Sequence, residues 1–408
     1  MPDNVIAATM PGPAAAADSL FARADALRPV LRARAAAAEA ARRVSVESVT
    51  DFRKAGLIRI TQPERFGGQA MGWDVLCGVS QRLTRGDGAQ GWVQAIMADH
   101  AQMLGTFPLQ AQEDVWGENP DAVMSASFDP KGIATPVEGG YSFSGRFGFA
   151  SGIDHADWLI CAGFIVIDDK RDGGEARDGP HFFLLRRSEA TIIDDWHTIG
   201  LEGTGSKSFE VKDVFVPGYA ILRGEDARTG NGPGAAVNPG GVYRLPRGFL
   251  TPSLFASMTV GMAQGLLDQW LAYTATRMSR GMKVADNPAS HMIAGECAAE
   301  IDAAEALNRD TITVAMKVLN AGGTLSDTEL LRAKRNSSWA CRTALNAGTR
   351  LFNTAGGTAI FKGGPVEREY RNLLASAAHH IVNWEVSALD SGAAMFWSAS
   401  GDSSEGAA

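Results

Sequence analysis

The apolar residues of this chain change their periodicity twice, and this change limits the possible folds more than any other feature. In the first stretch, residues 14–119, they recur at helical spacing, as Leu20, Leu27 and Leu31 show. Ser45 is a suitable N-cap for the helix that follows it. Further helices are predicted over 73–85 and 89–107. The chain is therefore expected to begin with a helical region.

The second stretch begins near Ala122 and shows the alternation that is typical of β-strands. Apolar residues occupy alternate positions from Tyr141 to Phe149, and all of these are aromatic except Gly145. Short apolar runs bounded by Gly, Pro and Asp follow at 158–167, 181–187 and 209–216. Residues 169–179 are charged and rich in glycine, which predicts an exposed hairpin loop.

From Leu250 onward the pattern is helical again, in long segments. The predicted helices cover 250–280, 289–320, 326–352 and 366–398. Four long helices suggest a bundle. Helices, then strands, then helices, without a β-α alternation, predict an α+β fold rather than a Rossmann fold.

The same changes divide the chain into expected domains. These are an N-terminal α-helical domain at 1–120, a central β domain at 121–235, a C-terminal four-helix bundle at 236–398 and a disordered tail at 399–408. Neither a GxGxxG motif after a strand nor a GxxxxGK[ST] motif occurs. A nucleotide, if the chain binds one, must therefore bind without these phosphate cradles.

Charge and composition exclude several partners. The formal net charge is −8 at pH 7, whereas a nucleic-acid-binding protein needs clustered Lys and Arg. No run of about 18 apolar residues occurs, and the first residues lack the features of a signal peptide. We therefore expect a soluble, cytoplasmic protein with no nucleic-acid or membrane partner. The 4 cysteines lie far apart, so neither a disulfide framework nor a metal site is expected.

His100 is the first candidate for chemistry. Trp92, Ile96, His100, Met103 and Phe107 fall on one helical face, so the imidazole is expected to point inward. One interpretation is a core histidine bonded to a backbone carbonyl. The other is a base or donor in an apolar pocket, where burial lowers its pKa and keeps the ring neutral.

Serine hydroxyls on the predicted strands form a second group. Ser125 and Ser127 share one strand face, and such hydroxyls are commonly structural. Ser151 lies at a strand end beside Gly152, which allows a sharp turn. A hydroxyl there either contacts a flat ligand or simply caps the turn.

The C-terminal part contributes a third group. His379 is expected at the edge of an apolar helical face, with His380 near the opposite side, so His379 is the preferred pocket residue. Arg277 belongs to a basic cluster at a predicted helix end, which is either a favourable helix terminus or an anion clamp. The segment Asn353 to Gly357 contains a glycine pair, Gly356 and Gly357, which is either a C-cap or a close approach to a ligand.

Four segments, in this order and spacing, resemble the group D flavin monooxygenases, two-component oxygenases built on the acyl-CoA dehydrogenase fold. They are FASGIDHADW (149–158), DWHTIGLEGTGSKSFEVKDVFVP (195–217), GVYRLPRGFL (241–250) and TAGGTAIFKGGPVEREYR (354–371), which leads into AAHH. The resemblance implies an acyl-CoA dehydrogenase-like fold with a central β-barrel or sandwich and a bundle that mediates a homotetramer. It implies reduced flavin (FADH2 or FMNH2) from a separate NAD(P)H-dependent flavin reductase, and O2. The implied reaction passes through a C4a-hydroperoxyflavin and hydroxylates a small phenolic or indolic aromatic.

The resemblance also implies roles for single residues. Ser151, beside Gly152, matches the serine that bonds the flavin near N5, and the backbone around Ser125 and Ser127 would flank the ring. His379 matches a histidine that acts on the oxygenated flavin or on the substrate hydroxyl. His100 matches a histidine that bonds a phenolic oxygen, in a substrate pocket with Trp92. The resemblance also implies that Asn353, Gly356 and Gly357 receive the cofactor tail, with further contacts from 203–208. Arg277 is implied to reach the flavin phosphates of a neighbouring subunit.

The dehydrogenases of the same superfamily are the main alternative. Many of them place a catalytic glutamate nine residues after an arginine that matches Arg371, and here that position is His380. The alternatives left open are therefore an N- or S-oxygenase of the same family, an acyl-CoA dehydrogenase with its base elsewhere, and a non-catalytic flavoprotein or nucleic-acid-associated relative. The acidic charge argues against the last of these.

Overall fold

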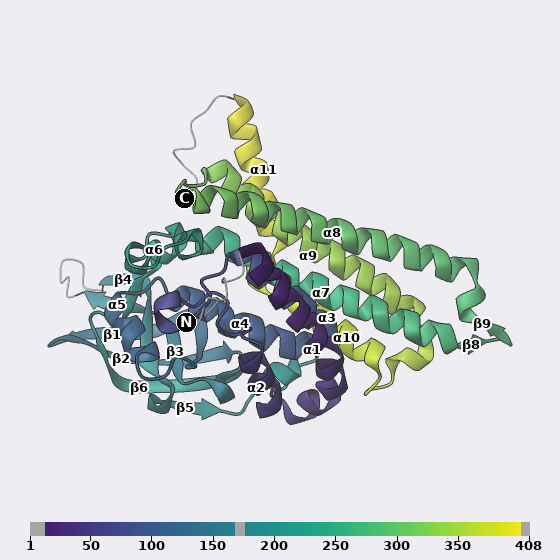
Figure 1. Cartoon of the computed structure of the whole chain (residues 1–408), viewed down its shortest axis with the longest axis horizontal. Helices are drawn as coiled ribbons and strands as arrows, with labels where there is room; N and C mark the ends of the chain where they lie inside the picture. Colours follow the sequence, from purple (N-terminus) through teal and green to yellow (C-terminus); the bar gives the residue numbers. More distant parts are fainter. Residues whose placement is uncertain (1–12, 168–175, 401–408) are drawn as a thin grey trace, which may run out of the picture.

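The computed structural model describes residues 13–167 and 176–400. In Figure 1 the strands of the large sheet lie at one end of the molecule, and the long C-terminal helices extend toward the other. The loop predicted at 169–179 lies partly outside the described residues, and its described part, 176–179, begins a strand instead. The predicted disordered tail lies outside them from residue 401 onward, and residues 399–400 still belong to a helix.

The N-terminal region is helical, as predicted. Its helices are α1 (Pro13–Ala41), α2 (Val46–Lys54), α3 (Trp73–Gly86), α4 (Gly88–Leu104) and α5 (Leu109–Trp116). Ser45 caps α2, since its hydroxyl accepts a hydrogen bond from the Ser48 amide at 3.2 Å. Asp87 caps α4 through the Gln90 amide at 2.9 Å. Every residue of α4 is buried, which makes α4 the central element of the molecule.

The middle of the chain forms a seven-stranded sheet in the order β5-β6-β2-β1-β3-β4-β7. The strands are β1 (Met124–Val137), β2 (Gly140–Ala150), β3 (Trp158–Ile167), β4 (Ala176–Arg186), β5 (Ala190–Ile193), β6 (Lys207–Pro217) and β7 (Ile221–Arg223). β1 and β3 are parallel, and the other pairs are antiparallel. Phe143 on β2 stacks on Phe183 on β4 with 4.5 Å between ring centroids, although β1 and β3 lie between these strands. The sheet therefore folds over an aromatic core in the manner of a sandwich.

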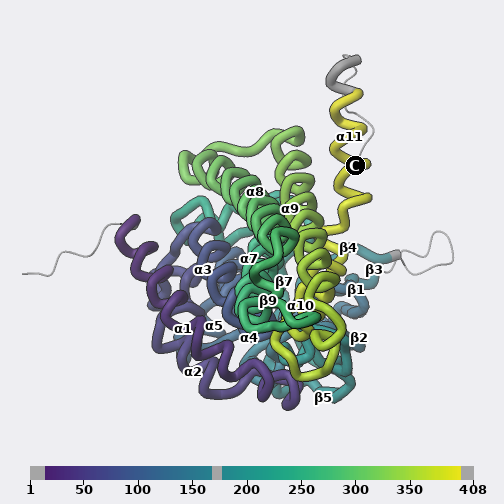
Figure 2. The backbone as a smooth tube through the Cα atoms, turned by 90° about the vertical axis from the view of Figure 1, so that its right-hand side faces the viewer, coloured from purple at the N-terminus to yellow at the C-terminus, as the bar shows by residue number. Residues whose placement is uncertain are grey.

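After the short helix α6 (Gly224–Thr229), the chain forms the long helices. They are α7 (Arg247–Thr276), α8 (Pro288–Asn320), α9 (Asp327–Thr354), α10 (Pro365–Ala377) and α11 (Trp384–Ser400). Helices α7, α8, α9 and α10 pack against one another, and Figure 2 shows them side by side. The predicted bundle is therefore present, with α10 as its short fourth member.

The helix predicted over 250–280 is wrong at its end. α7 stops at Thr276, and the chain then forms a hairpin of β8 (Met278–Ser279) and β9 (Met282–Lys283). Arg280 and Gly281 make the turn with φ of 50° and 80°, a conformation that suits two-residue hairpins. Gly281 is therefore a turn residue of this hairpin.

The helix predicted over 366–398 is also wrong, because α10 and α11 are separate helices. Between them His379 has an extended backbone, with φ −67° and ψ 131°. The Asn383 side chain accepts a hydrogen bond from the Val386 amide at 3.0 Å, which starts a new helix. The continuous helical face at whose edge His379 was expected therefore does not exist, and Leu389 of α11 is 73% exposed.

Two apolar cores meet at α4. Trp92 and Ile96 belong to the core formed with the C-terminal helices. Met103 and Leu104 belong to the core beneath the sheet. Figure 1 shows α4 between these two parts. A side chain in the middle of α4, such as His100, therefore lies at the junction of sheet and bundle.

The cysteines all lie in the described part of the chain. All 4 are buried free thiols, and burial raises the pKa of each. Separately, within residues 13–167 and 176–400, no helix is both long and apolar enough to cross a membrane.

A buried carboxyl group in α10 gives a first prediction about stability. Glu369 is 3% exposed, and its Oε2 has no hydrogen-bond partner among the described residues. Burial, with a further contribution from Asp87, raises its pKa well above the ordinary value. Native Glu369 therefore holds its proton more tightly than the unfolded chain does, so its contribution to stability is lost as pH rises from the unfolded pKa through the folded one.

Glu369→Gln is expected to raise the free energy of unfolding at neutral pH by about 1–3 kcal/mol. Urea unfolding from acidic to alkaline pH should show the difference from wild type growing as pH rises. Glu367→Gln is the matched control, because Glu367 accepts hydrogen bonds from Arg371 at 2.5 and 3.1 Å. That variant should be destabilised instead. A Glu369→Gln protein less stable than wild type at neutral pH contradicts the prediction.

Candidate active site

One ring nitrogen of His100, at the junction of sheet and bundle, has no hydrogen-bond partner among the described residues. The side chain is 2% exposed, and Nδ1 lies 3.0 Å from the carbonyl oxygen of Met124 on β1. Because a carbonyl oxygen can only accept, Nδ1 carries the hydrogen and the neutral ring has a bare Nε2. The Asp99 carboxylate is 4.0 Å from Nε2, beyond hydrogen-bond distance. Burial lowers the pKa of His100 against the opposing effect of Asp99, so the neutral form is favoured.

This geometry combines both interpretations of His100. The ring is held by a backbone carbonyl, as a core histidine would be, and it still offers an unpaired acceptor. Beside it, Phe128 meets the ring edge-on at 5.7 Å between centroids, and Phe182 meets Phe128 at 5.6 Å. Phe128 is 41% exposed, so the aromatic wall beside His100 reaches the surface.

Trp92, two helical turns before His100 on α4, joins the other candidates. Its indole Nε1 donates a hydrogen bond to the Ser151 hydroxyl at 3.1 Å. Its ring meets Phe255 of α7 edge-on at 5.2 Å and lies 6.0 Å from the ring of His379. Phe255 and His379 are 4.4 Å apart. The structure therefore brings together Trp92, Ser151 and His379, which are far apart in the sequence, and adds Phe255, which the sequence analysis missed.

His379 has the opposite tautomer to His100. Its Nδ1 accepts a hydrogen bond from the Ile381 amide at 3.3 Å, so the hydrogen of the neutral ring is on Nε2. Burial, with a smaller effect of His380, lowers the pKa of His379 to about 3. His379 therefore offers a donor in its neutral form. His380 stacks on it at 4.6 Å and is exposed, as predicted.

Ser125 and Ser127 use their hydroxyls to fasten β2. Ser125 donates to the Ser151 carbonyl at 2.9 Å, and Ser127 donates to the Gly148 carbonyl at 2.8 Å. These bonds replace the regular ladder between β1 and β2, which pairs only from Ile133 onward. The structural interpretation of both hydroxyls is therefore correct. Through Met124 and Ser125, β1 also links the positions of His100 and Ser151.

The glycines of the loop at 203–208 lie close to neighbouring segments of the chain. A Cβ on Gly203 would lie 3.1 Å from Ala89 on α4, and one on Gly205 would lie 2.9 Å from the carbonyl oxygen of Arg42. Both glycines allow the loop to pack against helices. Ser206 in the same loop bonds Ser151 at 2.8 Å, which no pattern in the sequence had indicated.

Arg277 lies against the glycine pair that was predicted to act with it. Its Nη1 is 3.4 Å from the Thr354 carbonyl, and its guanidinium occupies the space that a Cβ on Gly356 would fill. Gly357 faces open space, and Asn353 is exposed at the end of α9. No carboxylate among the described residues pairs with Arg277, so its charge is available to an anion.

The buried charges around His100 were also missed. Arg247 of α7 forms an ion pair with Asp99, donating to Oδ2 at 2.9 Å while its Nη1 lies 2.9 Å from Oδ1. It also donates to Gln102 at 2.5 Å. Asp99 is 1% exposed and Arg247 8%. Arg247 lies in the segment 241–250 that carries the family resemblance, and this was the only signal for it. The ion pair of Asp99 and Arg247 therefore lies next to His100, and its two charges compensate each other.

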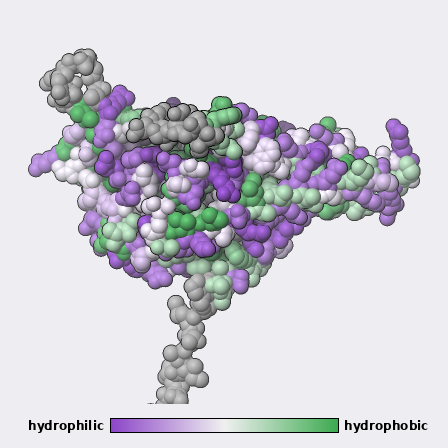
Figure 3. Space-filling model, turned by 90° about the horizontal axis from the view of Figure 1, so that it is seen from above, coloured by the Kyte–Doolittle hydropathy of each residue, from purple (hydrophilic) through white to green (hydrophobic). Residues whose placement is uncertain are grey.

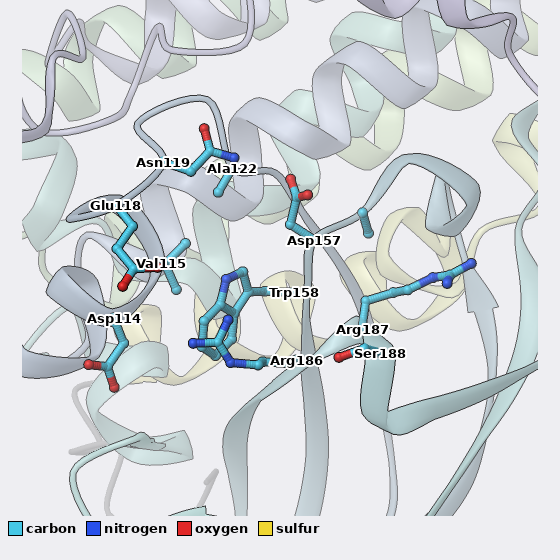
Figure 4. A pocket seen from close by; sticks show the side chains of 11 residues that line it. Asp114, Val115, Glu118, Asn119, Ala122, Asp157, Trp158, Arg186, Arg187 and Ser188 are labelled. Atoms are coloured by element: carbon cyan, nitrogen blue, oxygen red, sulfur yellow. The ribbon is translucent and has the colours of Figure 1, made fainter.

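A pocket of about 330 Å³ lies elsewhere, between α5 and the start of β3 (Figure 4). Arg186 covers the Trp158 ring there at 4.5 Å. No candidate residue lines this pocket. We therefore place the candidate active site at the junction around α4, where the hydroxyls, imidazoles and aromatic rings gather.

Comparisons with known proteins agree with this architecture. Residues 253–384 match the family described as acyl-CoA dehydrogenase, C-terminal domain. The crystal structure of 3-HSA hydroxylase from Rhodococcus sp. RHA1 has a TM-score of 0.86 at 31% identity, with 93% of this chain and 97% of that chain covered.

Two relatives are similar over nearly their whole length. The flavin-dependent monooxygenase, oxygenase subunit HsaA, of Rhodococcus jostii is 33% identical over 360 residues, which cover 88% of this chain and 93% of that protein. The oxygenase component of the FADH2-dependent resorcinol hydroxylase of a Rhizobium species is 33% identical over 377 residues, which cover 90% and 91%. The chain therefore belongs to the family of oxygenase components of flavin-dependent monooxygenases, on the acyl-CoA dehydrogenase fold.

Proposed function

We propose that this protein is the oxygenase component of a two-component monooxygenase that uses reduced flavin and O2 to hydroxylate a small aromatic molecule with an acidic OH or NH, such as a phenol or an indole. The observation that carries the proposal is the bare Nε2 of buried, neutral His100 beside the aromatic wall of Phe128. The related resorcinol hydroxylase acts on a phenol, which supports the same substrate class here.

His100 acts as the acceptor for the substrate. A phenolic OH within hydrogen-bond distance of Nε2 donates its proton to the ring, and this raises the electron density of the aromatic carbon that is oxygenated. Nδ1 cannot take this proton, because it is already bonded to the Met124 carbonyl. Reduced flavin, when bound, would supply the two electrons that activate O2, and the transferred oxygen atom would come from that O2.

His379 acts as the donor on the other side of the site. Its Nε2–H stays in place at neutral pH, since the pKa is lowered to about 3. Trp92 and Phe255 pack around it and exclude water from that wall, which limits stray proton transfer. Where many dehydrogenases place their catalytic glutamate, nine residues after the arginine that matches Arg371, this chain has His380, so the base that such a dehydrogenase needs is not at this position.

The residues present fit a flavin. Ser151 presents a hydroxyl at the junction, and Gly357 leaves open backbone where the cofactor tail would pass, near Asn353. Arg277 has no carboxylate partner among the described residues, so it suits a phosphate. We propose that Arg277 binds the flavin phosphates of a neighbouring subunit, that the segment 353–357 receives the cofactor tail, and that Ser151, next to Gly152, contacts the ring.

Arg277→Ala is expected to weaken flavin binding by about 10- to 100-fold, because a charge-assisted bond to phosphate contributes roughly 1.5–3 kcal/mol. The Kd for FAD and for FMN, measured by fluorescence titration, checks this. Arg309→Ala is the control, since Arg309 is an exposed residue of α8 whose side chain pairs with Glu305. Equal affinity for flavin in the Arg277→Ala and Arg309→Ala proteins contradicts the role of Arg277.

The protein is proposed to act with a separate NAD(P)H-dependent flavin reductase and to form a homotetramer. Related proteins are named oxygenase components, which implies a second component.

α11 projects beyond the bundle in both views (Figure 1, Figure 2) and exposes Leu389, Met395 and Phe396. On the face drawn in Figure 3, apolar side chains form only small groups among hydrophilic ones. Light scattering tests the tetramer, and a Leu389→Glu protein should dissociate.

Product analysis tests the function. The protein is mixed with FAD or FMN, any NADH-flavin reductase, and a panel of phenols, indoles, amines and thioethers, and products are identified by mass spectrometry. We expect a hydroxylated phenol or indole only when the oxygenase is present. Bleaching of bound flavin by an acyl-CoA without O2, and no oxygenated product, would support a dehydrogenase instead.

A further inference from the structure

The Ser151 hydroxyl is one member of a chain of hydrogen bonds that crosses the site. Trp92 Nε1 donates to Ser151 at 3.1 Å, and Ser151 bonds the Ser206 hydroxyl at 2.8 Å. Ser206 bonds the Thr204 hydroxyl at 2.6 Å, and Thr204 donates to the Leu201 carbonyl at 2.7 Å. We call the side chains of Trp92, Ser151, Ser206 and Thr204 the hydroxyl relay. All four are at least nine-tenths buried.

The two ends of the relay fix the direction of every proton in it. The Leu201 carbonyl can only accept, so the single hydroxyl hydrogen of Thr204 points to it. Ser206 must then donate to Thr204, and Ser151 must donate to Ser206. At the other end the Trp92 indole N–H can only donate, so Ser151 accepts from it. The proton of Ser151 is therefore held away from the active site.

The anchors of the relay are themselves held in place. The Leu201 amide donates to the Asn372 side chain of α10 at 2.8 Å, and Leu201 has φ of 55°, which a non-glycine residue adopts only when its surroundings hold it. The Gly152 amide donates to the Thr204 carbonyl at 3.0 Å. The sheet, α4 and α10 thus all fix the relay, so reversing it would require breaking several buried bonds.

We propose that the hydroxyl relay makes Ser151 a permanent hydrogen-bond acceptor and so makes the site select reduced over oxidised flavin. One lone pair of the Ser151 oxygen receives Trp92, and one is left for a ligand. The N5 position of reduced flavin carries a hydrogen and donates, whereas N5 of oxidised flavin can only accept. Reduced flavin therefore completes the relay, and oxidised flavin would place two acceptors against each other. Ser206, Thr204 and Trp92 are positioning residues that act through Ser151.

This inference rests on the proposed function, because it takes Ser151 as the contact to N5. The experiment compares the Kd of oxidised flavin in air with the Kd of reduced flavin under anaerobic conditions, for wild type and for Ser206→Ala. Without Ser206 the Ser151 proton is free to turn toward N5. The ratio of the Kd for oxidised flavin to that for reduced flavin is expected to fall by about tenfold, which is the effect of one hydrogen bond.

Two further variants test whether the ratio of the two Kd values depends on the direction of the hydroxyl relay. Thr204→Val removes the hydroxyl that sets the direction and should lower the ratio in the same way, whereas Thr204→Ser keeps the hydroxyl and should restore it. Ser80→Ala is the control, because Ser80 is a fully buried serine of α3 that donates to the Leu76 carbonyl outside the relay. Its ratio should equal that of wild type.

The outcomes separate the inference from the function. If wild type binds both forms and the ratio is unchanged in Ser206→Ala and Thr204→Val, the relay does not select the redox state, while the proposed function stands. If wild type binds neither FAD nor FMN in either form, the proposed function fails and the inference fails with it. Thermal unfolding of each variant identifies any that does not fold, and the ratio in the other variant then decides.

Discussion

Replacing His100 with alanine is expected to lower kcat/KM for a phenolic substrate by about a hundredfold or more, the range for loss of a general base. The variant removes the acceptor Nε2, whereas flavin binding does not depend on it. The oxidation of reduced flavin by O2 should therefore continue, with H2O2 released in place of hydroxylated product. Product and H2O2 measured in the same reaction check this.

The pH dependence gives a second measure of the same residue. His100 works in its neutral form, and burial lowers its pKa below the ordinary value of about 6.5. The acidic limb of kcat/KM should therefore lie below pH 6.5. His291→Ala is the control, since His291 is an exposed histidine of α8, and it should keep the wild-type rate. A His100→Ala protein that hydroxylates a phenol as fast as wild type contradicts the role of His100.

Replacing Arg247 with methionine is expected to destabilise the protein by about 3–5 kcal/mol, because it leaves the carboxylate of Asp99 buried without its partner. Asp99 is 1% exposed, and both of its oxygens lie 2.9 Å from Arg247. Urea unfolding at neutral pH measures the loss. In the folded fraction, the unpaired Asp99 charge should also raise the pKa of His100, so the acidic limb of kcat/KM should move to higher pH.

A second substitution separates the lost pair from lost packing. In Asp99→Asn combined with Arg247→Met no buried charge is left, so the double variant should be more stable than Arg247→Met alone. The acidic limb of its pH profile of kcat/KM should also return toward that of wild type. A double variant as unstable as the single one would show that Arg247 contributes by packing rather than by charge.

Periodicity predicted most of the elements and failed where a local bond overrides it. Residue patterns predicted the strands at 158–167 and 209–216, because burial of one face of a strand leaves a clear alternation. The residue type of Ser45 predicted the N-cap of α2. The break between α10 and α11 at His379 could not be predicted from such patterns, since the residues around it also suit a helix. It depends on the Asn383 cap and on packing against Phe255 of α7, a contact between residues far apart in the chain.

The candidate site also combines features that the sequence predicted with features that only the folded chain reveals. His100 could be found as the polar residue on an apolar face of α4, and His379 at the edge of an assumed helix. Their tautomers depend on the Met124 carbonyl and the Ile381 amide, and no sequence pattern reports these bonds. The hydroxyl of Ser206 also gains its role only from the distances in the folded chain. The family resemblance indicated the residues, and the structure supplied the direction of each bond.

The most direct test of the central claim uses isotopically heavy O2. The protein is given reduced flavin, a phenolic substrate and labelled O2 in ordinary water, and the product is analysed by mass spectrometry. The account predicts that each product molecule contains one labelled oxygen atom and that His100→Ala loses the labelled product. A product whose new oxygen comes from water, or an oxidised product that forms equally well without O2, would contradict it.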